Sequence, residues 1–152
     1  MKLDTAIILA TKAHHGQKDK QGQTYILHPL RVMRSVLEHG SSVTTNVENL
    51  AAVAVLHDVV EDTPVTLEYL RSMDDGLTDQ QCEWLDALTH RPKESRLDYI
   101  KRICHYPEAA FIKRMDIRDN VGRLDGLDMP TVDRLARKYA KDLVILNENS
   151  AQ

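Results

Sequence analysis

The chain has 152 residues, of which 42% are hydrophobic and 28% are charged, and its formal net charge is −3 at pH 7. This length predicts one domain with a buried core, and the composition is that of a globular protein rather than a disordered one. The acidic balance and an aromatic content of 5% argue against nucleic acid as the principal partner, because phosphate backbones attract basic surfaces and single strands stack on aromatic side chains.

The ends of the chain and its cysteines predict a cytoplasmic protein without a membrane partner. Residues 1–4 lack the long apolar core and the small-residue cleavage site of a signal peptide. No apolar run approaches the roughly 20 residues that span a bilayer. Cys82 and Cys104 form neither a metal-type pair nor a disulfide framework. The oligomeric state stays open.

Helical spacing dominates the first half of the chain. Apolar residues recur at this spacing near the N-terminus: Leu3, Ala6, Ile7, Ala10 and Ala13. The polar, glycine-punctuated stretch over residues 14–23 predicts a loop. Pro29 then stands at the first position of a second predicted helix, which Gly40 ends.

A third predicted helix runs from about Val47 to Glu61, where Thr63 and Pro64 break it. Further helices are expected to begin at or near Thr66, Thr78, Leu97, Ala109 and Pro130. Thr78 with Gln81 three residues later has the pattern of a capping box. Because we find no alternating strand, internal repeat or low-complexity linker, the sequence predicts a single all-α bundle of seven or eight helices.

The segment HDVVEDT at residues 57–63 follows the apolar run over residues 50–56. In a continuous helix His57 and Glu61 lie one turn apart, as do Asp58 and Asp62. Carboxylates this close repel one another, and a bound cation would relieve the cost of burying one of them. The alternative interpretation is a solvated acidic helix end, which a His-Asp pair by itself favours.

Four ionisable residues stand where helices usually carry apolar ones: His28, His57, Asp58 and Asp116. Two imidazoles and two carboxylates suit manganese, iron, zinc or magnesium. The set contains no thiolate, which would favour zinc. Such an ion can lower the pKa of bound water toward about 7. Glu61 and Asp62 could then orient that water or shuttle a proton. Spacing alone does not bring these segments together, and a lone histidine such as His28 is more often a structural residue than a metal ligand.

Three segments occur in series along the chain. AHHGQ over residues 13–17 leads to YILHPL over residues 25–30, HDVVEDT occupies residues 57–63, and IKRMDIRDN occupies residues 112–120. Together they resemble the HD superfamily of metal-dependent phosphohydrolases and, within it, the hydrolase domain of RelA/SpoT-type proteins. The length of the chain matches a stand-alone small alarmone hydrolase and leaves no room for a synthetase domain.

This resemblance implies an HD-type helical bundle over residues 1–152. It implies hydrolysis of the 3′-pyrophosphate of guanosine tetra- or pentaphosphate, which yields pyrophosphate and GDP or GTP. The implied ligands of a divalent metal, usually manganese, are His28, His57, Asp58 and Asp116. Glu61 and Asp62 become the catalytic carboxylates, and Asn120 becomes a contact to substrate or water.

Two places depart from the family's pattern. In the predicted loop over residues 14–23 the family usually carries an arginine, which lies against the guanine base, followed by a lysine. Here Asp19 stands in place of the arginine, and Lys20 matches the lysine. An aspartate cannot stack as a guanidinium does, and it repels phosphate. In the third segment, residues 117–119 read Ile-Arg-Asp, where the family more often has Arg, an apolar residue and His.

A polyphosphate also needs cations, and several flank the three segments: Lys18, Lys20, Lys113, Arg118 and Arg123. Each of them taken singly is better explained by solvated surface charge. Tyr139 could reach a nucleotide from the last predicted helix, or it could be a half-buried core residue. Trp84 lies at helical spacing with Leu85 and Leu88 and is predicted to be core.

The predicted partner is therefore a small-molecule nucleotide, most simply a guanosine alarmone. Two alternatives remain in different classes. The first is a phosphohydrolase of the same fold that acts on another nucleotide, which Asp19 favours. The second is a nucleotide-sensing module without turnover, against which the pair Glu61 and Asp62 argues.

Overall fold

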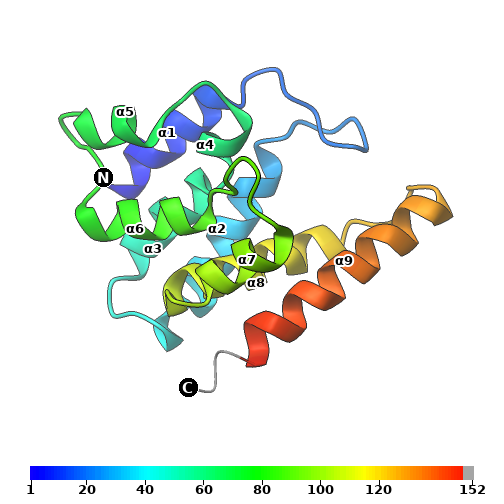
Figure 1. Ribbon diagram of the computed structural model, residues 1–152. Helices are drawn as coiled ribbons and strands as arrows, with labels where there is room; N and C mark the ends of the chain where they lie inside the picture. Colours follow the sequence, from blue (N-terminus) through cyan, green and yellow to red (C-terminus); the bar gives the residue numbers. More distant parts are fainter. Residues whose placement is uncertain (149–152) are drawn as a thin grey trace.

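The computed structural model describes residues 1–148, which form nine α-helices and one short 3-10 helix (Figure 1). The α-helices are α1 (Leu3–Ala13), α2 (Leu27–His39), α3 (Val47–Leu56), α4 (Val59–Asp62), α5 (Leu67–Ser72), α6 (Asp79–Leu88), α7 (Arg96–Ile103), α8 (Pro107–Val121) and α9 (Met129–Glu148). Within these residues no strand forms, and a single isolated bridge joins Lys18 to Thr24. The predicted all-α fold is confirmed.

Helix α3 lies at the centre of the core. Every residue from Leu50 to Leu56 is buried, so the helix beyond its first turn has no polar face, as expected of a segment that is covered on all sides. Asn46 begins it by accepting a hydrogen bond from the backbone N–H of Asn49 at 3.2 Å. Helices α1, α2, α6 and α8 pack around α3. This arrangement brings segments that are distant in sequence to the end of α3.

The central helix is shorter than predicted. The sequence predicts one helix from about Val47 to Glu61, but α3 ends at Leu56 and α4 begins at Val59. The ring of His57 hydrogen-bonds the carbonyl oxygen of Ala54 at 2.8 Å. A continued α-helix would offer that same carbonyl to the backbone N–H of Asp58. The predicted continuous helix from Val47 to Glu61 is therefore interrupted, and the split raises the number of α-helices in the described residues above the predicted seven or eight.

Helices α7, α8 and α9 form the other side of the molecule. Helix α9 contacts both α7 and α8 and runs along the side of the bundle, where Figure 1 draws it in orange and red. The loop between α1 and α2 extends toward the start of this helix in the same view. No helix in residues 1–148 is both long and apolar enough to cross a membrane.

Arg102 of α7 holds the connection between α6 and α7. Its guanidinium donates to three backbone carbonyls at the end of α6, and it pairs with the two carboxylate oxygens of Glu94 at 2.7 and 2.8 Å. Hydrogen bonding to Arg102 lowers the pKa of Glu94 to about 2. The same connection carries His90, whose backbone N–H donates to Glu61 at 3.1 Å. Arg102 therefore supports one wall of the region around Glu61.

We expect Arg102→Met to lower the free energy of unfolding by about 2 kcal/mol, because charge-assisted hydrogen bonds are lost and carbonyls are left without their donor. Urea denaturation followed by circular dichroism at pH 7 measures this loss. The pKa of Glu94 is depressed from 4.5, so its contribution is fully present above pH 4.5 and disappears as the pH falls through about 2.

Arg91→Met is the matched control for this measurement. Arg91 pairs with Asp86 at 2.6 Å, but both side chains are about half exposed, at 54% and 47%. An exposed pair of this kind contributes less than about 1 kcal/mol. Equal losses in the two variants would contradict the role given to Arg102.

Candidate metal centre

Three of the predicted metal ligands converge where α2 meets the end of α3. They are His28 near the start of α2 and His57 and Asp58 in the turn between α3 and α4, and one ligand atom from each lies within 4.8 Å of the others. The two histidines are 7% and 2% exposed. Asp116 of α8 stands beside this group, with its Oδ1 3.2 Å from Nε2 of His28 and 3.7 Å from Nε2 of His57.

The ring of His57 presents its Nε2 atom to this point. Because Nδ1 hydrogen-bonds the carbonyl of Ala54, Nδ1 carries the proton in the neutral ring and Nε2 keeps its lone pair. Nε2 is buried, lies 3.0 Å from a carboxylate oxygen of Asp58, and makes no hydrogen bond within the described residues. This buried nitrogen has no hydrogen-bond partner and faces the carboxylates of Asp58 and Asp116. A cation bound between these groups would satisfy the lone pair of the nitrogen.

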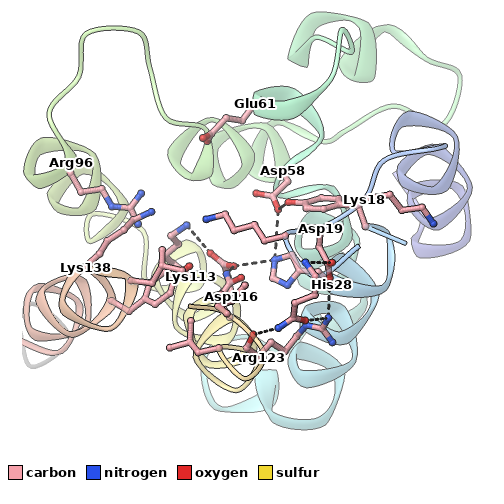
Figure 2. A pocket seen from close by; sticks show the side chains of 18 of the residues that line it. Lys18, Asp19, His28, Asp58, Glu61, Arg96, Lys113, Asp116, Arg123 and Lys138 are labelled. Atoms are coloured by element: carbon pink, nitrogen blue, oxygen red, sulfur yellow. Dashed lines mark hydrogen bonds and ion pairs between the residues drawn. The ribbon is translucent and has the colours of Figure 1, made fainter. Parts of the chain in front are cut away.

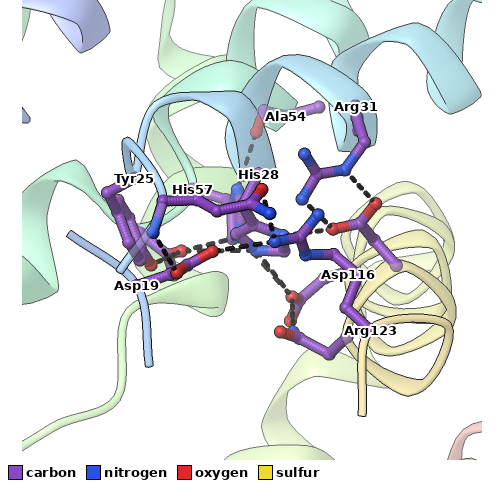
Figure 3. A network of polar contacts seen from close by, with 12 residues as sticks. Asp19, Tyr25, His28, Arg31, Ala54, His57, Asp116 and Arg123 are labelled. Carbon is purple, nitrogen blue, oxygen red and sulfur yellow. Dashed lines mark hydrogen bonds and ion pairs between the residues drawn. The ribbon is translucent and has the colours of Figure 1, made fainter. Parts of the chain in front are cut away.

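The ring of His28 is oriented by Asp119, which the sequence pattern marked only as a departure from the family. Nδ1 of His28 lies 2.7 Å from Asp119, and Arg31 holds the same carboxylate through two contacts at 2.7 and 2.9 Å (Figure 3). Hydrogen bonding to His28 and Arg31 outweighs burial and lowers the pKa of Asp119 to about 2. A carboxylate behind a ligand histidine fixes its ring and directs Nε2 toward the metal position.

The sequence does contain a signal that Arg31 and Asp119 lie beside the metal ligands. Arg31 follows His28 by three positions in α2, and Asp119 follows Asp116 by three positions in α8. Residues three apart share a helix face, so each ligand and its supporting residue point the same way once α2 and α8 pack together. The sequence pattern alone did not reveal that the two faces meet.

The charges at this centre balance one another without any metal. Burial lowers the pKa of His28 and His57, but the surrounding carboxylates outweigh burial and raise the pKa of both rings. Burial raises the pKa of Asp58 and Asp116, but the charge of His57 on Asp58, and that of Lys113 on Asp116, hold these pKa values below the ordinary range. Protons on the imidazoles thus supply positive charge that a divalent ion could replace. The residues fit such an ion.

The predicted catalytic carboxylates face different neighbours. Tyr25 donates its hydroxyl proton to Asp58 at 2.6 Å and also lies 3.3 Å from Asp62, whose pKa is raised by burial and by the charges of Asp58 and Glu61. Glu61 is exposed and accepts the backbone N–H of His90. Asp62 is also exposed, and it contacts Tyr25 without lining the cavity described below, whereas Glu61 lines that cavity.

A cavity of about 410 Å³ adjoins the metal centre, and Glu61 lines it (Figure 2). Its wall includes Tyr25, His28, Asp58 and Asp116, together with residues 18–21 of the loop between α1 and α2. Residues of α7, α8 and α9 close the remaining sides. The volume lies within the range of small-molecule sites, about 300–1,000 Å³.

The structure brings every predicted substrate contact to this cavity: Lys18, Lys20, Asn120, Lys113 and Tyr139. Lys113 is buried with its ammonium group 2.7 Å from one oxygen of Asp116, and Asn120 donates to the other oxygen at 2.6 Å. These two residues therefore also hold a predicted metal ligand. Tyr139 is half-buried and packs against the core, as the core interpretation expects, and it also lines the cavity; its contact with a nucleotide stays a prediction.

Of the other candidate cations, Arg123 lines the cavity, whereas Arg118 is exposed and does not. The charge of Asp19 is not left unpaired, because Nη2 of Arg123 lies 2.9 Å from its carboxylate and also reaches side-chain oxygens of Gln21 and Gln23 at 2.8 and 2.9 Å (Figure 3). The loop between α1 and α2 is thus fastened to the end of α8. The expected repulsion between Asp19 and phosphate is offset by a guanidinium in the same cavity.

Two further cations line the cavity that the sequence pattern did not single out. Arg96 at the start of α7 pairs with Asp142 at 2.6 Å, and Lys138 projects from α9. Burial, and then the charges of Arg96 and Lys113, lower the pKa of Lys138. Figure 2 shows Arg96, Lys138 and Lys113 together on one side of the metal centre. The helical spacing of basic residues in α9 is the signal that could have indicated this wall.

Comparison with solved structures identifies the class of fold. A structure described as that of a metazoan orthologue of SpoT that hydrolyses ppGpp superposes with a TM-score of 0.70, covering 97% of this chain and 92% of that one. The two sequences are 22% identical, so this similarity establishes the fold alone. It confirms the predicted HD-type helical bundle.

Curated relatives are more similar over part of the chain. The guanosine-3′,5′-bis(diphosphate) 3′-pyrophosphohydrolase of Danio rerio is 43% identical over 76 residues, which are 45% of this chain and 41% of that protein. The bifunctional (p)ppGpp synthase/hydrolase SpoT of Escherichia coli is 38% identical over 72 residues, or 47% of this chain and 10% of that protein. A GTP pyrophosphokinase of Streptomyces coelicolor is 41% identical over 70 residues, or 46% and 8%.

The chain thus matches less than half of the length of each of these relatives. No protein-family model matches it. The similarities confirm the resemblance to stand-alone and SpoT-type hydrolases that the three sequence segments predicted.

We expect Asp119→Ala to weaken the binding of Mn²⁺ by about 10- to 100-fold, because the ring of His28 would lose the carboxylate that orients it. Titration calorimetry of the metal-free protein measures the affinity. Arg118→Ala is the control, since Arg118 is the exposed neighbour in the same helix and lines no part of the cavity. Parent-like affinity in Asp119→Ala would remove Asp119 from the metal centre.

Proposed function

We propose that residues 1–152 act as a single HD-type phosphohydrolase domain that removes the 3′-pyrophosphate group of guanosine tetra- or pentaphosphate. One observation carries this proposal: His28, His57, Asp58 and Asp116 converge at a polar cavity of nucleotide size that is also lined by Glu61. The activity in the name of the Danio rerio relative supports the choice of substrate.

The metal ligands in this proposal are His28, His57, Asp58 and Asp116, and the ion is Mn²⁺. A set of nitrogen and oxygen donors without a thiolate fits manganese, iron, zinc or magnesium, and manganese is the ion that the resemblance to RelA/SpoT-type hydrolases implies. Lewis-acid activation of water and phosphate is the chemistry that a divalent ion supplies when it is bound there. Asp119, Lys113 and Asn120 keep the ligands in place through the contacts described above.

Glu61 is the residue that takes the proton of the attacking water. It is exposed to the cavity, and the backbone N–H of His90 holds its carboxylate without neutralising it. Asp62 assists through its contact with Tyr25, and burial together with the charges of Asp58 and Glu61 raises its pKa, which favours a role in carrying a proton. Tyr25 joins Asp62 to the metal ligand Asp58 and so fixes the relative positions of the two carboxylates.

The cations on two sides of the metal centre favour the choice of a substrate that has phosphate groups at both its 3′ and 5′ positions. Lys18 and Lys20 belong to the loop between α1 and α2, and Arg96, Lys113 and Lys138 form the wall at α7, α8 and α9 (Figure 2). Phosphate groups bind such donors through charge-assisted hydrogen bonds. A nucleoside with phosphate at one end only would leave one of these two groups without a partner.

We also propose that the protein works in the cytoplasm on this small-molecule nucleotide. Cys82 and Cys104 are both free thiols, which supports a reducing compartment.

Incubation of the manganese-loaded protein with guanosine tetraphosphate is expected to release GDP and pyrophosphate, which ion-exchange chromatography separates. Asp58→Ala is expected to release neither, because a metal ligand is lost. A panel of other nucleotides runs in parallel. Turnover of a different nucleotide, with none of guanosine tetraphosphate, would keep the metal mechanism and reassign the substrate. Binding without turnover of any nucleotide would indicate a sensing module instead.

We expect Glu61→Gln to lower kcat by about 10²- to 10⁴-fold, because the amide cannot accept the proton of water. Nucleotide affinity, measured by calorimetry, is expected to stay close to that of the parent, since Gln keeps the size of the side chain and its contact to His90. Glu68→Gln, on exposed α5 and away from the cavity, is the matched control. Unchanged turnover in Glu61→Gln would exclude Glu61 as the base.

A further inference from the structure

A second hollow of about 410 Å³ lies between α7 and α9. It shares the side chains of Arg96 and Lys138 with the cavity at the metal centre, so the two spaces adjoin at these residues. None of the metal ligands or predicted catalytic residues lines it. We call this hollow the basic groove, and its charged lining residues are Arg96, Arg134, Arg137, Lys138, Lys141 and Asp142.

The charged residues that line the basic groove are almost all cationic. Asp142 is its single acidic residue, is only 2% exposed, and pairs with Arg96 at 2.6 Å. Arg137 pairs with Asp133 at 2.9 Å along the surface of α9. Arg134, Lys138 and Lys141 form no ion pair with any residue between 1 and 148. Three cations are therefore available to an anion from outside.

This concentration of cations is unusual for a chain with a formal net charge of −3. Like charges at close range repel, and after burial the charges of Arg96 and Lys113 are the causes that lower the pKa of Lys138. An anion with several charges along its length would relieve this repulsion and gain charge-assisted hydrogen bonds. The apolar residues Leu97 and Ile145 complete the lining, and the one carboxylate in it, that of Asp142, is buried and already paired with Arg96.

We propose that the basic groove is a polyphosphate subsite, and this proposal extends the function proposed above. A substrate whose 3′ group lies at the metal centre directs its 5′ phosphates past Arg96 and Lys138, the two residues that both spaces share. A third 5′ phosphate then reaches Arg134 and Lys141, which line the basic groove but not the cavity. The protein consequently binds guanosine pentaphosphate more tightly than guanosine tetraphosphate.

The kinetic test compares the two guanosine substrates in the double variant Arg134→Gln, Lys141→Gln. We expect the KM for the pentaphosphate to rise about fivefold, the size of an exposed charge interaction, while the KM for the tetraphosphate changes by less than about twofold. The kcat for both substrates stays at the parent value, because neither residue touches the metal centre. Lys101→Gln is the matched control, since Lys101 is exposed on α7 and lines neither space.

A binding test stands independently of turnover. Inorganic triphosphate, titrated by calorimetry into the metal-free protein, is expected to bind the parent and to bind the double variant about fivefold more weakly. Higher salt should weaken binding to the parent, because the groups involved are exposed.

The two tests together separate the possible outcomes. If the variant weakens triphosphate binding but raises both KM values equally or not at all, the basic groove holds a separate polyphosphate rather than the tail of the substrate. If triphosphate binds there and neither guanosine compound is hydrolysed, the proposed function fails and the subsite stands. If the double variant changes neither triphosphate binding nor the preference between substrates, the subsite is wrong.

Discussion

In the last turn of α3 the carbonyl of Ala54 bonds the ring of His57 instead of the backbone N–H of Asp58. This hydrogen bond ends the most deeply buried helix of the molecule, and it fixes the tautomer that leaves Nε2 of His57 available. Asp58, in the turn between α3 and α4, reaches Tyr25 and both histidines. The arrangement of the metal centre depends on this local competition for a single carbonyl oxygen.

The buried carboxylates at the centre are tolerable because cationic and hydrogen-bonding groups surround each of them. Asp116 receives hydrogen bonds from Lys113 and Asn120, and Asp119 receives them from Arg31 and faces His28. Breaking such a pair leaves an uncompensated buried charge, which costs far more than the pair itself contributes. Helix α8 supplies most of these groups at spacings of three and four residues, so one helix face both binds and supports the ligands.

Much of the fold could be predicted because apolar spacing and helix caps are local signals. The capping box of Thr78 and Gln81 and the cap at Thr66 are present as expected, and Trp84 is buried in the core. The break after Leu56 could not be predicted in this way, since a side-chain hydrogen bond leaves no trace in apolar spacing. The partnership of Asp19 with Arg123 spans 104 positions, so it became visible only when the loop and the end of α8 were placed together.

That partnership changes how Asp19 should be interpreted. Taken by itself, an aspartate at this point of the loop replaces a group that could stack on a base with one that repels phosphate. In the folded chain Arg123 of the segment after α8 occupies the same cavity, pairs with Asp19 and holds Gln21 and Gln23. A guanidinium from the opposite wall therefore lies beside Asp19 and compensates its charge. Since Asp116 and Asn120 belong to the helix that ends just before Arg123, α8 places one side of the metal centre and this wall of the cavity close together.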